Sequence, residues 1–214
     1  MRILLARHGE TAWNAEGRYQ GQEDTPLSET GEKQARRLGE RLRDMRIDRA
    51  VCSPLTRTYH TAQFALGEVR ATMLMIDNDL MEIAHGRWEG KLASEIEAED
   101  PERFRAWRET PDKVKMPDGE SLKQVLDRAW PALAKACDGM AGDETLLVVS
   151  HDAVNRALIC RILGLPLFKF WTFRQAPATL NLLEGPDVDR LEVVRLNDCS
   201  HHTLFFGESV HRAL

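Results

Sequence analysis

Short apolar runs alternate along this chain with segments that have the periodicity of a helix. Four runs have the length and composition of buried strands, at residues 3–6, 50–52, 73–76 and 145–149. The last run is nearly all apolar, which is typical of a strand at the centre of a parallel sheet. Because strands and helices alternate, the pattern predicts an α/β fold: a three-layer α/β/α sandwich with a mostly parallel central sheet.

Signals for helix starts stand between the predicted strands. One helix is expected to begin at Ser28 or Thr30, because a hydroxyl there can accept a hydrogen bond from a free amide of the first turn. A second helix is expected to open at Ser53-Pro54, with proline in its first turn. Ser121 caps a third helix, which Pro131 should kink. The other predicted elements are a polar loop over residues 8–27, a helix that ends at Gly164, and late strands over residues 178–183 and 191–196.

Residues 80–120 differ in composition from the rest of the chain. They are rich in charge and carry Trp88, Trp107 and three prolines. We expect a loop and short helices that lie over one end of the sheet as a lid-like insertion. A length of 214 residues fits one domain, so residues 1–214 are predicted to form a single domain that includes this insertion.

Composition argues against several classes of partner. The formal net charge is −5 and no basic stripe interleaves with aromatic residues, so nucleic acid is not an expected partner. No segment approaches the ~18 apolar residues of a spanning helix, so no membrane association is expected. The first apolar run is too short for a signal peptide, and the four cysteines are widely spaced, so we expect reduced thiols in a cytoplasmic protein. The apolar content of the tail, residues 199–214, leaves open whether it packs on its own subunit or forms a homodimer.

Residues with strong chemical functions follow the ends of the predicted strands. Arg7 and His8 follow the first strand, Arg57 follows the second, Glu82 the third and His151 the fourth. In open α/β sheets, ligands bind beyond the carboxyl ends of the strands. We therefore expect these side chains to share one crevice.

The types of these residues suit phosphate chemistry. An imidazole such as that of His8 can attack phosphorus directly, and the planar guanidinium groups of Arg7 and Arg57 can hold phosphoryl oxygens. His151 can donate a hydrogen bond to a phosphoryl oxygen and stabilise charge in the transition state. Glu82 stands between apolar neighbours, which should raise its pKa, so it could protonate a leaving oxygen and later take a proton from water.

Each of these residues also has a plainer interpretation. His8 alone could be a surface turn histidine, Arg57 a helix-surface arginine, His151 a buried structural histidine, and Glu82 a solvated loop acid. Their joint placement at one edge of the sheet favours the functional interpretation. A metal site at Glu82 and His85 is not expected, because no further ligand has suitable spacing.

The motifs resemble those of a known superfamily. Arg7-His8-Gly9, Asn14, Arg57, Glu82 and Ser150-His151 match, in order and spacing, the histidine phosphatase superfamily, also called phosphoglycerate-mutase-like. The resemblance covers essentially the whole chain. It implies a phosphohistidine on His8, Glu82 as the proton donor, and neither metal nor cofactor. It also implies a phosphate pocket made by Arg7, Asn14, Arg57 and His151.

Within that superfamily the chain is most similar to the metal-independent phosphoserine phosphatases. The similar segments are residues 82–90, 104–107, 111–114, 119–122, 167–173 and 196–197. The resemblance implies hydrolysis of L-phosphoserine, a reaction of serine biosynthesis, with a small phosphomonoester as the partner. His85 is then expected to contact the seryl part of the substrate. The other candidate substrate-binding residues are Asn14, Gln20, Gly21 and Asp152.

Other activities remain open beside this one. A cofactor-dependent phosphoglycerate mutase would use the same histidine, but mutases of the family usually carry a longer, basic lid, and residues 80–120 here are partly acidic. A phosphatase acting on another small phosphomonoester, such as ribazole phosphate, is a further alternative. A phosphate-binding subunit without activity is disfavoured, because the full set of reactive residues is present. A nucleotide-binding Rossmann domain is disfavoured because no GxGxxG motif follows a strand.

Overall fold

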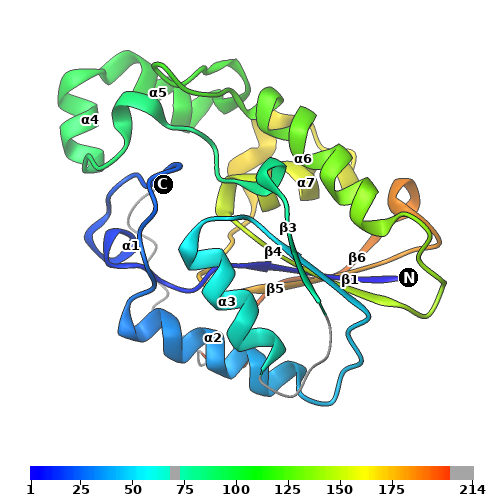
Figure 1. Cartoon of the computed structure of the whole chain (residues 1–214). Coiled ribbons are helices and arrows are strands. Elements are labelled where there is room, and N and C mark those ends of the chain that lie inside the picture. The colour runs from blue at the N-terminus through cyan, green and yellow to red at the C-terminus, as the bar shows by residue number, and fades with distance from the viewer. Residues whose placement is uncertain (68–72, 203–214) are drawn as a thin grey trace.

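The computed structural model describes residues 1–67 and 73–202, and within these ranges the strands form one six-stranded sheet. Its order is β3-β2-β4-β1-β5-β6 (Figure 1). The pairs β3–β2, β2–β4 and β4–β1 are parallel, whereas β5 pairs antiparallel with both β1 and β6. The strands are β1 (Arg2–Arg7), β2 (Arg49–Cys52), β3 (Leu74–Ile76), β4 (Thr145–Ser150), β5 (Leu180–Glu184) and β6 (Glu192–Asp198).

Helices cover both faces of this sheet, with α2 and α3 on one face and α6 and α7 on the other (Figure 1). The predicted α/β sandwich with a mostly parallel sheet is therefore confirmed. The α-helices are α1 (Ala12–Glu16), α2 (Glu29–Leu42), α3 (Thr56–Leu66), α4 (Ala93–Glu99), α5 (Pro101–Glu109), α6 (Leu122–Cys137) and α7 (Asp152–Ile162). The 3₁₀ helices are η1 (Asn78–Leu80), η2 (Gly86–Trp88), η3 (Pro111–Lys113), η4 (Leu167–Thr172) and η5 (Val188–Arg190).

The side chains of β1 alternate between two hydrophobic cores. Ile3 and Leu5 belong to the larger core, together with residues of α6 and α7. Leu4 and Ala6 belong to the smaller core, together with residues of α2 and α3. Because both faces of the strand are buried, β1 has the continuous apolar run of a central parallel strand rather than an alternating one. This burial holds β1 in the centre of the sheet up to Arg7, its last residue.

The predicted helix starts are confirmed at two places and wrong at a third. The Ser28 hydroxyl accepts a hydrogen bond from the Gly31 amide at 3.0 Å, and Ser121 forms a capping box with Gln124. The helix expected at Ser53-Pro54 begins instead at Thr56, because Leu55 is extended, with φ −64° and ψ 135°. Pro131 lies inside α6 without ending it.

Two further expectations from the sequence need correction. The polar loop predicted over residues 8–27 contains the short helix α1, which a capping box between Thr11 and Asn14 stabilises. A helix of 5 residues is too short to show periodicity in a sequence. The strand expected from residue 178 begins at Leu180, because Ala178 has a left-handed φ of 51°.

Residues 80–120, here called the lid segment, lie over one end of the sheet and contain α4 and α5 (Figure 1). Ile96 of α4 and Trp107 of α5 are fully buried and belong to the larger core. The lid segment therefore packs into the same core as α6 and α7. In the described ranges, no helix combines the length and the apolar composition needed to cross a membrane.

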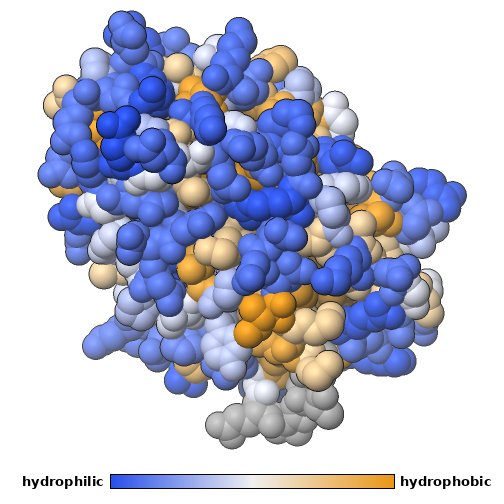
Figure 2. Space-filling view, turned by 45° about the horizontal axis from the view of Figure 1, so that its top comes forward, coloured by the Kyte–Doolittle hydropathy of each residue, from blue (hydrophilic) through white to orange (hydrophobic). Residues whose placement is uncertain are grey.

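The surface is mostly hydrophilic, with a compact hydrophobic area on the face that Figure 2 shows. Exposed large hydrophobic side chains include Met73, Met75 and Ile76, on or beside β3, which is an edge strand of the described sheet. The prediction about the tail concerns residues 199–214, of which residues 203–214 lie outside the described part of the chain.

Candidate active site

The sheet brings the predicted reactive residues to one edge. Strands β2, β4 and β1 are parallel neighbours, so their carboxyl ends meet there. The His8 amide donates to the Ser150 carbonyl at 3.0 Å, and the Ser53 amide donates to the Val149 carbonyl at 3.2 Å. These bonds place the segments that follow the three strands side by side.

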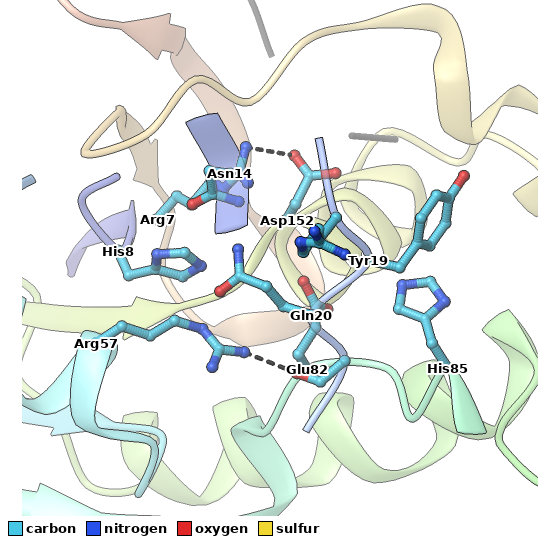
Figure 3. Close-up of a pocket in the computed structure, with 11 residues that line it drawn as sticks. Arg7, His8, Asn14, Tyr19, Gln20, Arg57, Glu82, His85 and Asp152 are labelled. Atoms are coloured by element: carbon cyan, nitrogen blue, oxygen red, sulfur yellow. Dashed lines mark hydrogen bonds and ion pairs between the residues drawn. The ribbon is translucent and has the colours of Figure 1, made fainter. Parts of the chain in front are cut away.

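A pocket with an empty volume of about 310 Å³ opens at this edge (Figure 3). Its two sides differ in chemistry: Arg7 and Arg57, with His8 beside them, form a cationic side, whereas Tyr19 and His85 form an aromatic side. The residues that line the pocket are Arg7, His8, Asn14, Arg18, Tyr19, Gln20, Gly21, Arg57, Glu82, His85 and Asp152. All the predicted site residues are among them except His151.

His8 is buried at the end of β1, and one ring nitrogen has a defined role. Its Nδ1 lies 2.6 Å from the Gly9 carbonyl oxygen, which can only accept, so Nδ1 carries the proton. In the neutral ring, Nε2 is then the nitrogen with the lone pair. Gly9 cannot be replaced freely, because a Cβ there would lie 2.5 Å from the Gly31 carbonyl oxygen. The backbone thus holds the imidazole in the tautomer that a nucleophile at Nε2 requires.

Arg57 is the second residue of α3, and backbone carbonyls fix its guanidinium. Nη1 donates to the Glu23 carbonyl at 2.8 Å, and Nη2 donates to the Gly21 carbonyl at 2.7 Å. Gly21 has a left-handed φ of 54°, and a Cβ there would overlap the Glu89 carboxylate. Burial lowers the pKa of Arg57 to about 10, against the opposing charge of Glu82, so the side chain remains cationic at neutral pH.

Arg7 is fixed by hydrogen bonds to the segment before β5 and to the first residue of α7. Its Nη1 donates to the Gln175 carbonyl at 2.5 Å and to Oδ1 of Asp152 at 3.3 Å. Gln175 is in turn fixed by a pair of amide hydrogen bonds with Asn181 of β5. Burial lowers the pKa of Arg7, and the charges of Asp152 and Glu82 act against that shift.

The Glu82 carboxylate lies at the N-terminus of α7. Its Oε1 accepts hydrogen bonds from the amides of Ile83 at 2.9 Å and Ala153 at 3.2 Å. Burial raises the pKa of Glu82, and the negative charge of Asp152 raises it further. The Ile83 hydrogen bond and the charges of Arg57 and Arg7 lower it, but the net shift is upward, in the direction that the sequence predicted.

The loop that carries Glu82 is clamped by α6. Arg128 donates from Nη1 to the Met81 carbonyl at 2.6 Å and from Nη2 to the Glu82 carbonyl at 2.9 Å. Its Nε donates to Glu120 at 2.8 Å, and Glu120 also accepts from the Ala84 amide at 2.9 Å. Arg128 was not predicted to be a site residue, because an arginine on a predicted helix carries no sign of such a contact.

The His151 ring packs edge-to-face against the His8 ring, with the two ring centroids 5.2 Å apart. Its Nε2 is 2.9 Å from the Ser53 hydroxyl, and its buried Nδ1 has no hydrogen-bond partner among the described residues. Burial, followed by the charges of Arg57 and His8, lowers the pKa of His151 well below its usual value. His151 is therefore a neutral imidazole beside the cationic side of the pocket.

Asn14 and Gln20 have their acceptor atoms engaged within their own loop. Oδ1 of Asn14 accepts from the Thr11 amide at 3.1 Å, and Oε1 of Gln20 accepts from the Thr25 hydroxyl at 2.8 Å. Both side chains line the pocket. The NH₂ half of each amide is the part that can donate to a ligand, which suits an anion.

His85, on the aromatic side, packs edge-to-face against aromatic rings. Its ring centroid lies 4.9 Å from that of Tyr19 and 6.1 Å from that of Trp107 in the lid segment. Burial lowers the pKa of His85 to about 3, so this imidazole is also neutral. Its Nδ1 has no partner in the described ranges. The sequence analysis did not assign Tyr19 or Arg18 to the pocket, although both belong to the polar segment that it had singled out.

Donors to an anion dominate this arrangement. Among the described residues, no group of three or more His, Cys, Asp or Glu side chains is placed to hold a metal ion. Two arginines and two side-chain amides line the pocket beside a histidine whose Nε2 carries its lone pair. The pocket can therefore bind a phosphoryl group and attack it.

Comparisons with known proteins agree with this chemistry. The profile of the histidine phosphatase superfamily (branch 1) matches residues 3–199. Phosphoserine phosphatase 1 of Hydrogenobacter thermophilus is 37% identical over 214 residues, which is 100% of both chains. A probable phosphoglycerate mutase of Klebsiella pneumoniae is 39% identical over 169 residues, 78% of this chain and 77% of its own.

Two further relatives extend the range of activities. The adenosylcobalamin/alpha-ribazole phosphatase of Salmonella typhimurium is 37% identical over 174 residues, 81% of this chain and 85% of its own. The solved structure of Bacillus stearothermophilus YhfR has a TM-score of 0.88 and 33% sequence identity, and covers 94% of this chain and 99% of that chain. The names of the curated relatives therefore give more than one activity, whereas YhfR shows the likeness in fold.

Proposed function

The chain belongs to the histidine phosphatase superfamily, and from that premise we propose that it hydrolyses L-phosphoserine through a phosphohistidine on His8. The observation that carries this proposal is the likeness to a phosphoserine phosphatase over 100% of both chains. The geometry of His8 supports the chemical part. Its Nδ1 is engaged by the Gly9 carbonyl at 2.6 Å, so Nε2 is the attacking atom.

In the first step, Nε2 of His8 attacks phosphorus and the ester P–O bond breaks. Protonated Glu82 gives its proton to the leaving seryl oxygen, so serine departs as the alcohol and Glu82 becomes a carboxylate. The raised pKa of Glu82 supports this role, because it favours the acid form before the reaction. The phosphoryl group is then bonded to His8.

In the second step, water attacks the same phosphorus and the P–N bond to His8 breaks. The Glu82 carboxylate takes a proton from the attacking water, which restores the acid form. Inorganic phosphate leaves, and His8 regains its lone pair on Nε2. One residue thus supplies and recovers the proton in the two halves of the cycle.

Charge on the phosphoryl oxygens is stabilised by donors held in fixed positions. Arg7 and Arg57 each have hydrogen bonds to backbone carbonyls that fix the guanidinium. Asn14 and Gln20 line the pocket, and their NH₂ groups are proposed as further donors. Nδ1 of the neighbouring His151, which has no partner among the described residues, is proposed as another. Because these donors are already oriented, little reorganisation is needed when charge develops in the transition state.

His85 is the residue proposed to contact the amino-acid part of the substrate. It lines the pocket opposite the cationic side (Figure 3). Phosphoserine carries an ammonium and a carboxylate close to its phosphate, and a site must pair such groups when it buries them. Nδ1 of His85, which has no partner in the part of the chain that the structure describes, is proposed to make one such hydrogen bond.

Phosphoglycerate mutase activity is the second candidate, since one relative with 39% identity is a probable mutase. The lid segment argues against it. Its helices α4 and α5, and the residue between them, carry a run of acidic residues, which would repel a bisphosphorylated cofactor. The acidic residues are Glu95, Glu97, Glu99, Asp100 and Glu102.

A substrate panel tests the proposal. Initial rates would be measured with L-phosphoserine, phosphothreonine, 3-phosphoglycerate and ribazole phosphate, with an alkaline quench to preserve phosphohistidine for mass spectrometry. We expect the highest kcat/KM with phosphoserine and a labelled His8 peptide. Preference for ribazole phosphate, or interconversion of phosphoglycerates when the bisphosphate is added, would overturn the substrate but not the intermediate. No phosphohistidine with any substrate would overturn both.

A further inference from the structure

A buried carboxylate that the proposed reaction does not use lies beside the site. Asp152 is the first residue of α7 and is fully buried. Its Oδ1 accepts from Nη1 of Arg7 at 3.3 Å, and its Oδ2 accepts from Nε of Arg156 at 2.8 Å. Both oxygens are therefore bound by arginines, although Asp152 also lines the pocket and was predicted from the sequence to bind substrate.

Arg156 anchors this arrangement on its far side. Its Nη1 donates to the Phe170 carbonyl at 3.1 Å and also to the Phe173 carbonyl. The guanidinium carbon lies 5.1 Å from the ring centroid of Trp171. Because every partner is packed or hydrogen-bonded, the line Arg7–Asp152–Arg156 has a fixed geometry. An uncompensated charge at any point of it would be costly to bury.

Asp152 also sets the charge balance around Glu82. The two arginines of the cationic side favour an ionised Glu82, whereas a neighbouring carboxylate favours the protonated form. The Glu82 carboxylate accepts from the amide of Ala153, the residue directly after Asp152, at 3.2 Å, and both carboxylates line the same pocket. The negative charge of Asp152 accordingly raises the pKa of Glu82. The other charged or titratable groups that face Glu82 or its backbone are Arg7, His8, Arg57, His85 and Arg128.

We propose that Asp152 is a positioning residue, which orients Arg7 and keeps on Glu82 the proton that the leaving oxygen needs. This inference rests on the proposed phosphatase mechanism. Arg156 has two roles in this proposal. It holds Asp152 in place, and its positive charge weakens the effect of the Asp152 charge on Glu82. The pair therefore tunes the acid without touching the substrate.

The pH profile of kcat/KM tests the proposal with three variants. Asp152→Asn keeps the shape but removes the charge, so Glu82 should lose its proton at lower pH, and the basic limb should move down by about 1 pH unit. Arg156→Gln leaves the Asp152 charge less compensated, so the basic limb should move up. Asp152→Glu retains the negative charge, so the basic limb of its profile should lie close to that of the wild-type enzyme.

The substrate for these profiles is L-phosphoserine, or whichever alkyl phosphate the wild-type enzyme hydrolyses fastest. p-Nitrophenyl phosphate is the control, because its leaving group needs no proton and its kcat/KM should lack this basic limb. A limb that stays in place in Asp152→Asn, or that moves in the same direction in Asp152→Asn and Arg156→Gln, would overturn the proposal. A rise in KM for phosphoserine with an unmoved limb would instead assign Asp152 to substrate binding.

A second readout does not depend on turnover. The carboxyl ¹³C signal of Glu82, identified by its loss in Glu82→Gln, would be titrated in the wild-type protein and in the variants. The midpoint should fall in Asp152→Asn and rise in Arg156→Gln. If the wild-type enzyme hydrolysed no phosphomonoester, the proposed function would fail, whereas unchanged midpoints in both variants would refute the tuning by Asp152. If one of the variants Asp152→Asn and Arg156→Gln does not fold, the other still tests the proposal, because the titration midpoint of Glu82 has an expected direction of change in each.

Discussion

The two sides of the pocket are built in different ways. On the cationic side, Arg7 and His8 leave the sheet at the end of β1, and Arg57 comes early in the helix that follows β2. On the aromatic side, Tyr19 comes from the loop after α1 and His85 from the lid segment. Secondary structure fixes the first side, whereas packing between distant loops fixes the second. We therefore expect changes on the cationic side to abolish chemistry and changes on the aromatic side to alter selectivity.

The strongest test of this contrast is His8→Ala. We expect no measurable turnover and no phosphohistidine, because no other side chain on the cationic side can carry the phosphoryl group. The fold should persist, since the His8 side chain lines the pocket, and thermal unfolding would verify this. Turnover near the wild-type rate in a folded His8→Ala protein would refute the mechanism.

Glu82→Gln should have the next largest effect, since Glu82 lies between the two sides. We expect a loss of about 10²–10⁴-fold in kcat/KM for phosphoserine, the usual range for general acid–base catalysis. Gln keeps the shape and can still accept the amide hydrogen bonds of Ile83 and Ala153. The loss in kcat/KM should be smallest for p-nitrophenyl phosphate. Equal losses on both substrates would mean that Glu82 serves the structure rather than proton transfer.

On the aromatic side, His85→Phe should change selectivity, with a smaller loss of kcat/KM than Glu82→Gln. Phenylalanine keeps an aromatic ring against Tyr19 and Trp107 but removes the ring nitrogens. We expect a lower kcat/KM for phosphoserine. The decrease should correspond to a loss of about 1–3 kcal/mol of transition-state stabilisation, as for one lost hydrogen bond to a charged group. Hydrolysis of p-nitrophenyl phosphate should be spared.

The pH dependence of that loss provides a check. With a pKa of about 3, the His85 imidazole is protonated only at pH values below that, so it is neutral throughout the range from mildly acidic to alkaline conditions. The ratio of wild-type to His85→Phe rates should therefore be constant over this range. A ratio that changes near the ordinary pKa of histidine would show that His85 is more exposed to solvent than the structure indicates.

The smallest effect is expected from chelation. The arginines of the cationic side supply the positive charge that a metal ion would otherwise bring to the phosphoryl group. Rates with excess EDTA should equal those without it. A loss of activity that magnesium or zinc restores would contradict this prediction and would place a metal on the side of the pocket now assigned to Arg7 and Arg57.

Much of the fold could be predicted from local signals. Apolar runs located the central strands, and Ser28 and Ser121 marked helix starts that the structure confirms. The errors have local causes as well. Helix α1 is too short to show a period, and Ser53 lies 2.9 Å from His151 through its hydroxyl instead of capping α3. A capping residue and a residue that serves a distant side chain look alike in a sequence.

The candidate site divides in the same way. The sequence by itself predicted the candidate reactive set, because Arg7, His8, Arg57, Glu82 and His151 each stand at or after a strand end, and parallel strands bring such ends to one edge. Only the tertiary structure decided which atoms act. The Gly9 carbonyl selects Nε2 of His8, Arg128 clamps the Glu82 loop, and Asp152 is bound between two arginines. The strands themselves follow from patterns of a few residues, whereas the order of strands in the sheet, tautomers, pKa shifts and buried ion pairs depend on groups that are far apart in the chain and meet only when it folds.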